Sequence, residues 1–148
     1  MFIIQSALQT LKKYADFKGR ASREEFWCFF AFLIIANAVA SFVGLLLGVY
    51  GALSAIVGAL LVIPQVAVAV RRLHDLGKSG RELVVPCVML LAVPLAFVFR
   101  GILPKIVALG FLGITLLVFA NLLTLFLKKG SKIPNRYGAA PTAFSFAR

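Results

Sequence analysis

Four long apolar runs alternate with short polar segments along this chain. The runs cover residues 26–49, 52–70, 83–99 and 106–127, and none of them contains Asp, Glu, Lys, Arg or His. A helix needs about 20 apolar residues to cross a bilayer, with a usable range of about 17–25. Each run meets that requirement, and the connectors between the runs are short. The pattern predicts an all-α, polytopic membrane protein with four transmembrane helices arranged as two hairpins.

The segment before the first run predicts a further, shorter helix. Apolar side chains recur at helical spacing at Ile4, Leu8, Leu11 and Ala15, and polar side chains occupy the opposite side. A short amphipathic helix of this kind lies on a membrane surface. We therefore expect a single membrane domain over 1–148, made of a cytoplasmic amphipathic N-terminus (1–25), a four-helix membrane bundle (26–127) and a cytoplasmic tail (128–148).

Composition and charge indicate the surroundings of the chain. Hydrophobic residues make up 61% of the 148, the mean hydropathy is +0.99 and the net charge is +11. A strongly basic balance indicates either nucleic acid or an anionic membrane surface as partner. Of the 16 Lys and Arg residues, 14 flank the apolar runs on one side, and only Arg100 and Lys105 lie on the other. The positive-inside rule then places both termini in the cytoplasm, with anionic membrane lipids and not nucleic acid as partners.

Small residues predict how the first two apolar runs pack. Helices in lipid approach closely where small side chains repeat every four residues. Both runs carry such a stripe, so we expect the first two helices to touch through them: Ala36, Ala40, Gly44 and Gly48 in the first, and Gly51, Ala55 and Ala59 in the second.

The polar segments carry helix-start and helix-stop signals. Ser22 and Glu25 have the S-x-x-E spacing of a capping box, and Ser79 and Glu82 repeat it. The block RRLHDLGKSG, residues 71–80, predicts that the second helix continues to Asp75 and that Gly77 ends it in a left-handed conformation. Either arginine of the block can pair with Asp75, because the spacings are three and four residues.

The same block supports several chemical interpretations. A polar turn at the membrane interface is the plainest of them. Its cations and its Gly-Ser turn are also typical of phosphate or lipid-headgroup recognition. His74 beside Asp75 is a candidate for proton transfer, but no second nucleophile accompanies it. The candidate lipid- or phosphate-binding residues are Arg71, Arg72, Lys78, Ser79, Arg20 and Arg23.

Metal and cofactor chemistry has little support in the sequence. The chain has one histidine and two cysteines, Cys28 and Cys87, which stand in separate runs without a C-x-x-C pair. Such a set cannot assemble a zinc or redox site. The G-K-S of residues 77–79 lacks the earlier glycine of a nucleotide-binding loop, because Arg72 occupies that position. We expect no metal and no cofactor.

Three segments carry a resemblance to a known family. The stretches FKGRASREEFW (17–27), RRLHDLGKSG (71–80) and NRYGAAP (135–141) resemble, in order and spacing, the signature segments of the bacterial family called domain of unknown function 805. The resemblance implies a small multi-span protein of the bacterial inner membrane, and it implies no biochemical activity. It also suggests that the three segments belong together, and the expected hairpin geometry brings them to one membrane face. There a structural polar network is expected among Asp75, His74, Glu24, Glu25 and Arg136, together with the arginines named above.

Three functions follow as hypotheses. The first is a non-enzymatic membrane protein whose basic cytoplasmic face binds anionic lipid headgroups or a protein partner. The second is a subunit of an oligomeric transporter or channel. A single copy is not expected to transport ions, because no ionisable residue lies within the apolar runs. The third is a lipid-modifying enzyme that uses His74 and Asp75. An enzyme would be expected to show a second catalytic group, so we favour the first hypothesis.

Overall fold

The computed structural model describes residues 2–88, 102–139 and 141. In this part of the chain every regular element is a helix, apart from an isolated β-bridge between Asn135 and Gly138. In chain order the helices are α1 (Phe2–Lys12), α2 (Arg23–Leu46), α3 (Ala52–Asp75), the 3₁₀ helix η1 (Gly80–Leu83) and α5 (Ile102–Leu127). The prediction of an all-α chain is confirmed for these residues. The third apolar run lies mostly outside them.

The first two apolar runs form a helical hairpin. The helices α2 and α3 each have 24 residues and are apolar and long enough to cross a membrane. Gly48 and Gly51 turn the chain between them, with φ angles of +72° and +73°, which residues with a Cβ atom rarely adopt. The fourth run forms α5, with 26 residues. Large apolar side chains such as Phe42, Leu46 and Leu117 are 61–73% exposed, as expected where lipid is the solvent.

The small-residue stripes pack as predicted on α2 but not on α3. Ala40 and Gly44 are buried, and a Cβ atom added to Gly44 would lie 3.1 Å from the Val49 carbonyl oxygen. On α3, however, Ala55 and Ala59 are exposed. The prediction for that helix is wrong in its register.

A neighbouring row of α3 makes the contact instead. Leu53 Cβ would lie 3.6 Å from a Cβ atom on Gly44, and a Cβ atom on Gly58 would lie 3.5 Å from Asn37 Oδ1. Neighbouring rows of side chains on a helix are separated by only a small rotation about the helix axis. A stripe of small residues therefore does not identify by itself which row faces the neighbouring helix.

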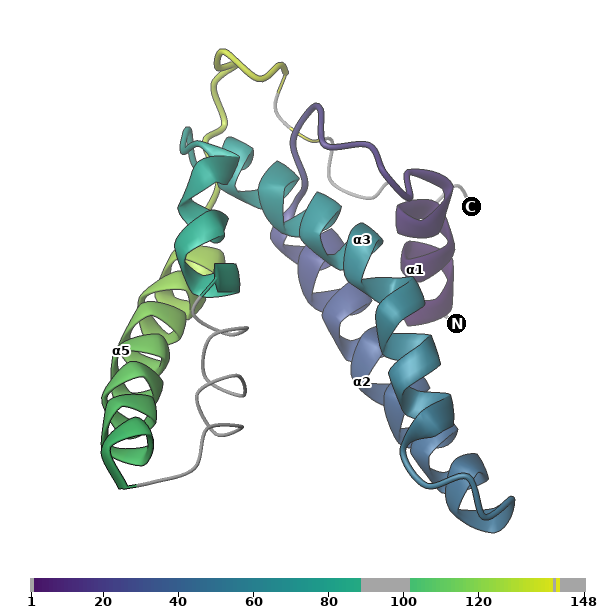
Figure 1. Cartoon of the computed structure of the whole chain (residues 1–148). Coiled ribbons are helices and arrows are strands. Elements are labelled where there is room, and N and C mark those ends of the chain that lie inside the picture. Colours follow the sequence, from purple (N-terminus) through teal and green to yellow (C-terminus); the bar gives the residue numbers. More distant parts are fainter. Residues whose placement is uncertain (1, 89–101, 140, 142–148) are drawn as a thin grey trace.

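The predicted N-terminal helix is present as α1, and it packs against α2 and α3 (Figure 1). Its buried side chains are Ser6, Ala7 and Thr10, whereas Leu8 is 53% exposed. The small side chains and the partly buried Leu11 therefore face the protein, and the apolar side chain at Leu8 remains outside. This arrangement differs from a helix that touches only lipid with its apolar side.

The segment after α1 reaches a proline in α3. Pro64 has no backbone N–H, so the carbonyl of Leu60, four residues earlier, has no partner within the helix. The Tyr14 hydroxyl donates a hydrogen bond to that carbonyl oxygen. In a membrane an unpaired carbonyl is costly, and the tyrosine removes this cost. The contact also holds the N-terminal segment against α3.

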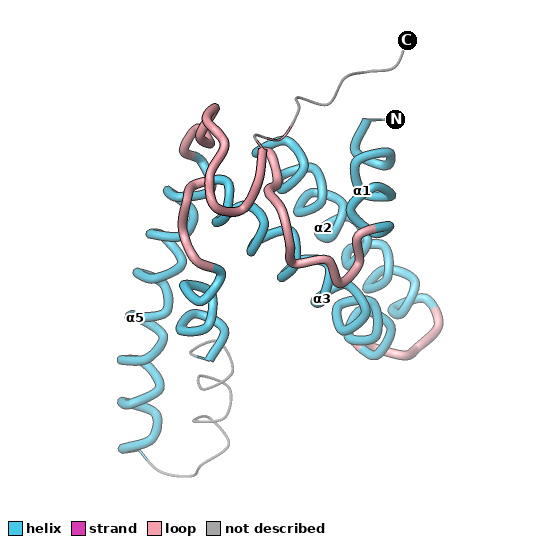
Figure 2. Tube along the Cα trace, turned by 90° about the horizontal axis from the view of Figure 1, so that it is seen from above, coloured by secondary structure: helices cyan, strands magenta, loops and turns pink. Residues whose placement is uncertain are grey.

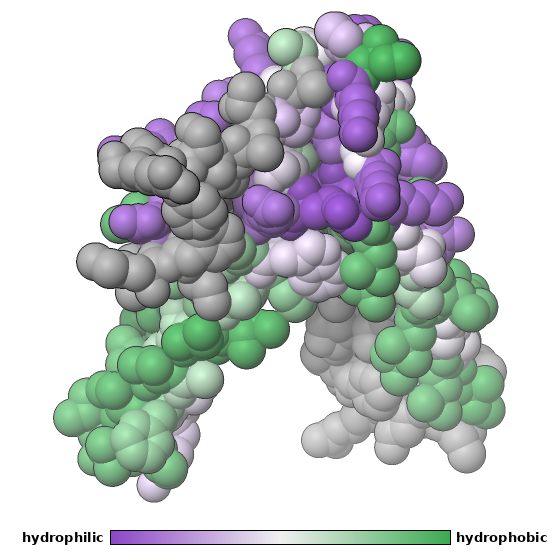
Figure 3. Space-filling model, turned by 180° about the vertical axis from the view of Figure 1, so that it is seen from behind, coloured by the Kyte–Doolittle hydropathy of each residue, from purple (hydrophilic) through white to green (hydrophobic). Residues whose placement is uncertain are grey.

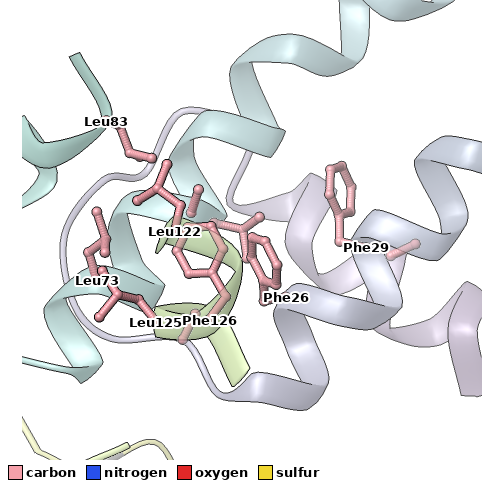
Figure 4. Packing of buried hydrophobic residues seen from close by; sticks show 11 residues of the cluster. Phe26, Phe29, Leu73, Leu83, Leu122, Leu125 and Phe126 are labelled. Atoms are coloured by element: carbon pink, nitrogen blue, oxygen red, sulfur yellow. The ribbon is translucent and has the colours of Figure 1, made fainter. Parts of the chain in front are cut away.

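The helices converge at one end and diverge towards the other (Figure 1). The start of α2, the end of α3 and the end of α5 share one hydrophobic cluster, shown in Figure 4, in which the Phe26 and Phe126 ring centroids lie 4.4 Å apart. Polar residues gather over this end, and the diverging helices below them are apolar (Figure 3). Figure 2 looks onto the polar end, where the loops cross. The fold thus brings sequence-distant polar segments together.

Candidate functional site

Asp75, the last residue of α3, lies at the centre of the polar end. Arg20 donates to Asp75 Oδ1 from Nε at 3.0 Å and from Nη2 at 2.8 Å. Arg72 Nη1 donates to the other oxygen, Oδ2. The three side chains are between 0% and 3% exposed. One carboxylate is therefore held between two guanidinium groups out of water, an arrangement that gains stability when the other guanidinium donors also find acceptors.

Backbone carbonyls accept most of those remaining hydrogen bonds; Arg72 Nε, which is buried, has no acceptor in the described part of the chain. Arg72 Nη2 donates to the carbonyls of Phe126, at 3.3 Å, and Lys128. Arg23 Nη1 donates to the Leu127 carbonyl at 3.3 Å. These carbonyls belong to the end of α5, where they have no helical partner and carry partial negative charge. The two arginines thus cap α5 and join it to α2 and α3.

The segment after α5 closes over Asp75. Arg20 Nη1 donates to the carbonyls of Ile133, at 3.0 Å, and Gly138, at 3.3 Å, and its Nη2 donates to the Ser131 carbonyl. The Ser131 N–H in turn donates to the Asp75 carbonyl at 3.1 Å. Because Arg20 binds both Asp75 and this segment, one side chain connects the segments before α2, at the end of α3 and after α5.

The segment passes so close to Asp75 that one position has no room for a side chain. A Cβ atom added to Gly130 would overlap Asp75 Oδ2 and would lie 2.5 Å from Asp75 Cγ. Both Asp75 oxygens are fixed by arginines, so the carboxylate cannot turn away without losing an ion pair. Gly130 is therefore required by close approach and not by its backbone conformation.

Arg71 makes a second ion pair beside the first. Its Nη2 donates to Glu25 Oε1 at 2.9 Å, with 2% of the arginine side chain and 13% of the glutamate side chain exposed. Its Nη1 donates to the carbonyls of Asp16, at 2.7 Å, and Lys13, at 3.4 Å. Arg71 thus binds the segment between α1 and α2, while its neighbour Arg72 binds α5. Of the two arginines predicted to pair with Asp75, only Arg72 does so.

The predicted helix ends are mostly confirmed. Ser22 accepts from the Glu25 N–H at 3.1 Å, and Ser79 caps η1 by accepting from the Arg81 N–H at 3.3 Å. Gly77, at φ +74°, ends α3, with the Lys78 N–H bonded to the Leu73 carbonyl and the Gly77 N–H to the His74 carbonyl. This pair of bonds is a Schellman motif.

The second halves of the two capping boxes are not formed. Glu25 binds Arg71, and Glu82 binds Lys78 at 2.8 Å, in place of the backbone N–H groups expected from the sequence. A cation is a stronger partner for a carboxylate than a neutral amide is, which accounts for the difference.

His74, the neighbour of Asp75 in the last turn of α3, is held by three groups. Its ring stacks on Tyr137, with centroids 3.8 Å apart and planes 5° apart. His74 Nδ1 lies 3.1 Å from the Gly19 carbonyl oxygen, so Nδ1 carries the hydrogen in that bond. Asn135 Nδ2 donates to the His74 carbonyl at 2.8 Å. Arg136 lies 4.8 Å from the centre of the Tyr137 ring.

The structure divides the predicted site residues into two groups. Arg20, Arg71 and Arg72 are buried, with their terminal guanidinium nitrogens bound to carboxylates or carbonyls, so they belong to the structural network with Asp75 and not to an accessible phosphate site. The other predicted residues lie at the surface or near it. Among these Arg23 and Glu24 are exposed, Lys78 is paired with Glu82, and Ser79 caps η1.

Gly130, Asn135 and Tyr137 are network members that the sequence interpretation missed. For Asn135 and Tyr137 the signal was the NRYG stretch, residues 135–138, whereas Gly130 lies before this stretch and had no signal in the sequence. Within the described residues, no group of three or more His, Cys, Asp and Glu side chains is placed to hold a metal ion.

These features define a class of helical protein with apolar helices long enough to span a membrane, joined at one end by a buried arginine–aspartate network. The model of the family described as "Protein of unknown function (DUF805)" matches residues 14–139, and the chain belongs to this family. The resemblance inferred from the three sequence segments is confirmed.

Two curated relatives come from Escherichia coli strain K12. Inner membrane protein YhaI is 38% identical over 78 residues, which cover 52% of this chain and 66% of the relative. Inner membrane protein YhaH is 42% identical over 82 residues, which cover 49% of this chain and 64% of the relative. The chain thus spans slightly less than two thirds of the length of each. No solved structure matches the chain.

Proposed function

We propose that this chain is a non-enzymatic protein of the bacterial inner membrane, with four spans and both termini in the cytoplasm, whose basic cytoplasmic face binds anionic lipid headgroups. Membership of a family whose relatives are named inner membrane proteins supports the location. The distribution of 14 basic residues on one side against two on the other supports the orientation.

One observation carries the lipid proposal: the cations of the polar end fall into two populations. The buried arginines are neutralised within the protein. By contrast Lys12, Lys18, Lys129 and Lys132 are exposed, and no ion pair involves them among the described residues. Exposed lysines beside a membrane attract the anionic lipids of the cytoplasmic leaflet. The protein's excess positive charge therefore lies where headgroups are available.

Lipid retention tests this proposal. We expect the full chain, extracted in mild detergent and washed at low salt, to retain phosphatidylglycerol or cardiolipin in preference to phosphatidylethanolamine, as measured by mass spectrometry of the bound lipids. Raising the salt concentration should remove much of the preference, because exposed charges are screened. Retention in proportion to membrane composition, at low salt as well as high, would argue against the proposal.

Orientation is tested separately. Reporter proteins fused after Arg148 and inserted into the turn between α2 and α3 should report cytoplasm and periplasm respectively. The turn lies at the far end of α2 and α3 from the polar end (Figure 1), and 14 of the 16 basic residues are predicted on the side of the polar end. A periplasmic signal from the Arg148 fusion would reverse the proposed topology.

His74 distinguishes a structural role from catalysis. His74→Phe keeps an aromatic ring for stacking on Tyr137 but cannot titrate or bond to the Gly19 carbonyl. We expect this variant to complement a deletion strain as the wild type does, with a modest loss of thermal stability in detergent of about 1 kcal/mol for the hydrogen bond. His74→Ala, which also removes the stack, serves as the comparison. A His74→Phe protein that stays stable yet fails to complement would favour a proton-transfer function.

A further inference from the structure

A basic cavity opens beside the buried network, at the start of α2. Its volume is about 410 Å³. Three elements meet there: the first turn of α2, the end of α3 and the segment that follows α5. The lining residues are Ser22, Arg23, Glu24, Arg72, Asp75, Lys129, Gly130, Ser131, Lys132 and Pro141.

Charge in this cavity favours an anion. Asp75 is already neutralised by its two arginines, which leaves one acidic lining residue, Glu24, beside three basic ones, Arg23, Lys129 and Lys132. Glu24 has no ion pair among the described residues. A cavity of this size with three accessible cations fits a phosphate group and the atoms attached to it.

An apolar groove continues from the cavity along α2. Its volume is about 410 Å³, and Arg23 and Glu24 line both spaces. The other lining residues are Trp27, Cys28 and Ala31 on the same face of α2, and Leu127 at the end of α5. From Arg23 to Ala31 the groove follows about 12 Å of helix, from the charged end into the apolar part of α2. The basic side chains at one end suit a phospholipid headgroup, and the apolar groove at the other end suits an acyl chain.

We infer that this cavity and groove form a site for one anionic phospholipid, with its phosphate between Arg23, Lys129 and Lys132 and one acyl chain along Trp27, Cys28 and Ala31. The inference rests on the proposed function and assigns the lipid preference to one place. Most of the preference comes from this site and not from the rest of the basic surface. Trp27 supports the placement, because indole rings favour the depth at which headgroups meet acyl chains. The buried Asp75 network shapes the cavity floor and does not bind the lipid.

The test compares two pairs of lysines on the full chain in detergent, by native mass spectrometry of bound dioleoylphosphatidylglycerol. Lys129→Gln with Lys132→Gln should weaken binding at least about tenfold. The matched control, Lys12→Gln with Lys18→Gln, removes the same charge from exposed positions outside the cavity and should change binding less than about twofold. None of these four lysine side chains is buried, so the variants are expected to fold.

A separate substitution tests the apolar groove. Ala31→Phe fills the groove without changing charge and should reduce binding of the long-chain lipid severalfold. The control, Ala38→Phe, lies at an exposed position of the same helix outside the groove and should not reduce binding. Inorganic phosphate at millimolar concentration should compete only weakly. Effective competition by phosphate, together with no effect of Ala31→Phe, would overturn the phospholipid and indicate a site for free phosphate.

The outcomes separate this site from the broader proposal. Equal losses from both lysine pairs, or no loss from either while the wild type still prefers phosphatidylglycerol, would overturn the site and leave the basic-face proposal standing. A wild-type protein without any preference over dioleoylphosphatidylethanolamine would overturn both. Loss confined to the Lys129 and Lys132 pair supports the site.

Discussion

Asp75→Asn is expected to lower the free energy of unfolding in detergent by about 3–5 kcal/mol, the usual effect of breaking a buried ion pair. Asparagine has nearly the shape of aspartate but no charge, and its amide nitrogen would point donor hydrogens at one of the two arginines that now donate to the carboxylate. Two buried guanidinium groups would then lose their shared counter-ion. The end of α5 and the segment after it, which these arginines hold, should loosen together.

The matched control for this change is Glu82→Gln. It converts the same kind of group in the Lys78–Glu82 pair, whose side chains are each 38% exposed. An exposed pair four residues apart contributes about 0.3–0.5 kcal/mol, so the melting temperature of this variant should stay close to that of the wild type. Equal melting temperatures for Asp75→Asn and Glu82→Gln would contradict the central role given to the buried network.

Local signals allowed several parts of this site to be predicted from the sequence. The serine at position 22 and the glycine at position 77 mark helix ends through bonds within a few residues, and both act as expected. The three-residue spacing of Arg72 and Asp75 is also a local relation, and the pair forms. Hairpin topology then predicted that the three polar segments meet. Short-range geometry and membrane topology were sufficient for these features.

The acceptors of the arginines could not be predicted, because most of them are backbone carbonyls. Every residue has a carbonyl, so the sequence gives no sign that those of Phe126, Lys128, Ser131 and Ile133 would bind Arg72 and Arg20. For the same reason the arginines looked available for phosphate. Adjacent residues on a helix point about 100° apart, so Arg71 and Arg72 reach different segments although they are neighbours in sequence. Burial, and not residue type, distinguishes a structural arginine from a ligand-binding one here.

Gly130→Ala is expected to destabilise the protein by about 1–3 kcal/mol, the usual cost of overpacking a filled site. The added methyl group would occupy the position of Asp75 Oδ2, so either the carboxylate must leave an arginine or the segment after α5 must move away. In the second case the bonds from Arg20 to the Ser131 and Ile133 carbonyls would lengthen. Thermal unfolding in detergent measures the effect.

The control and a double substitution make this prediction specific. Gly58→Ala in α3 adds the same methyl group at ordinary contact distance, 3.5 Å from Asn37 Oδ1, and should be neutral or stabilising by up to about 1 kcal/mol, since alanine favours helix more than glycine does. Asp75→Ala removes the atoms that the methyl group would strike. In that background Gly130→Ala should cost much less than in the wild type, because the two positions are in contact and their effects are not additive. An undiminished cost of Gly130→Ala in the Asp75→Ala background would mean that the glycine serves the loop's backbone and not the approach to Asp75.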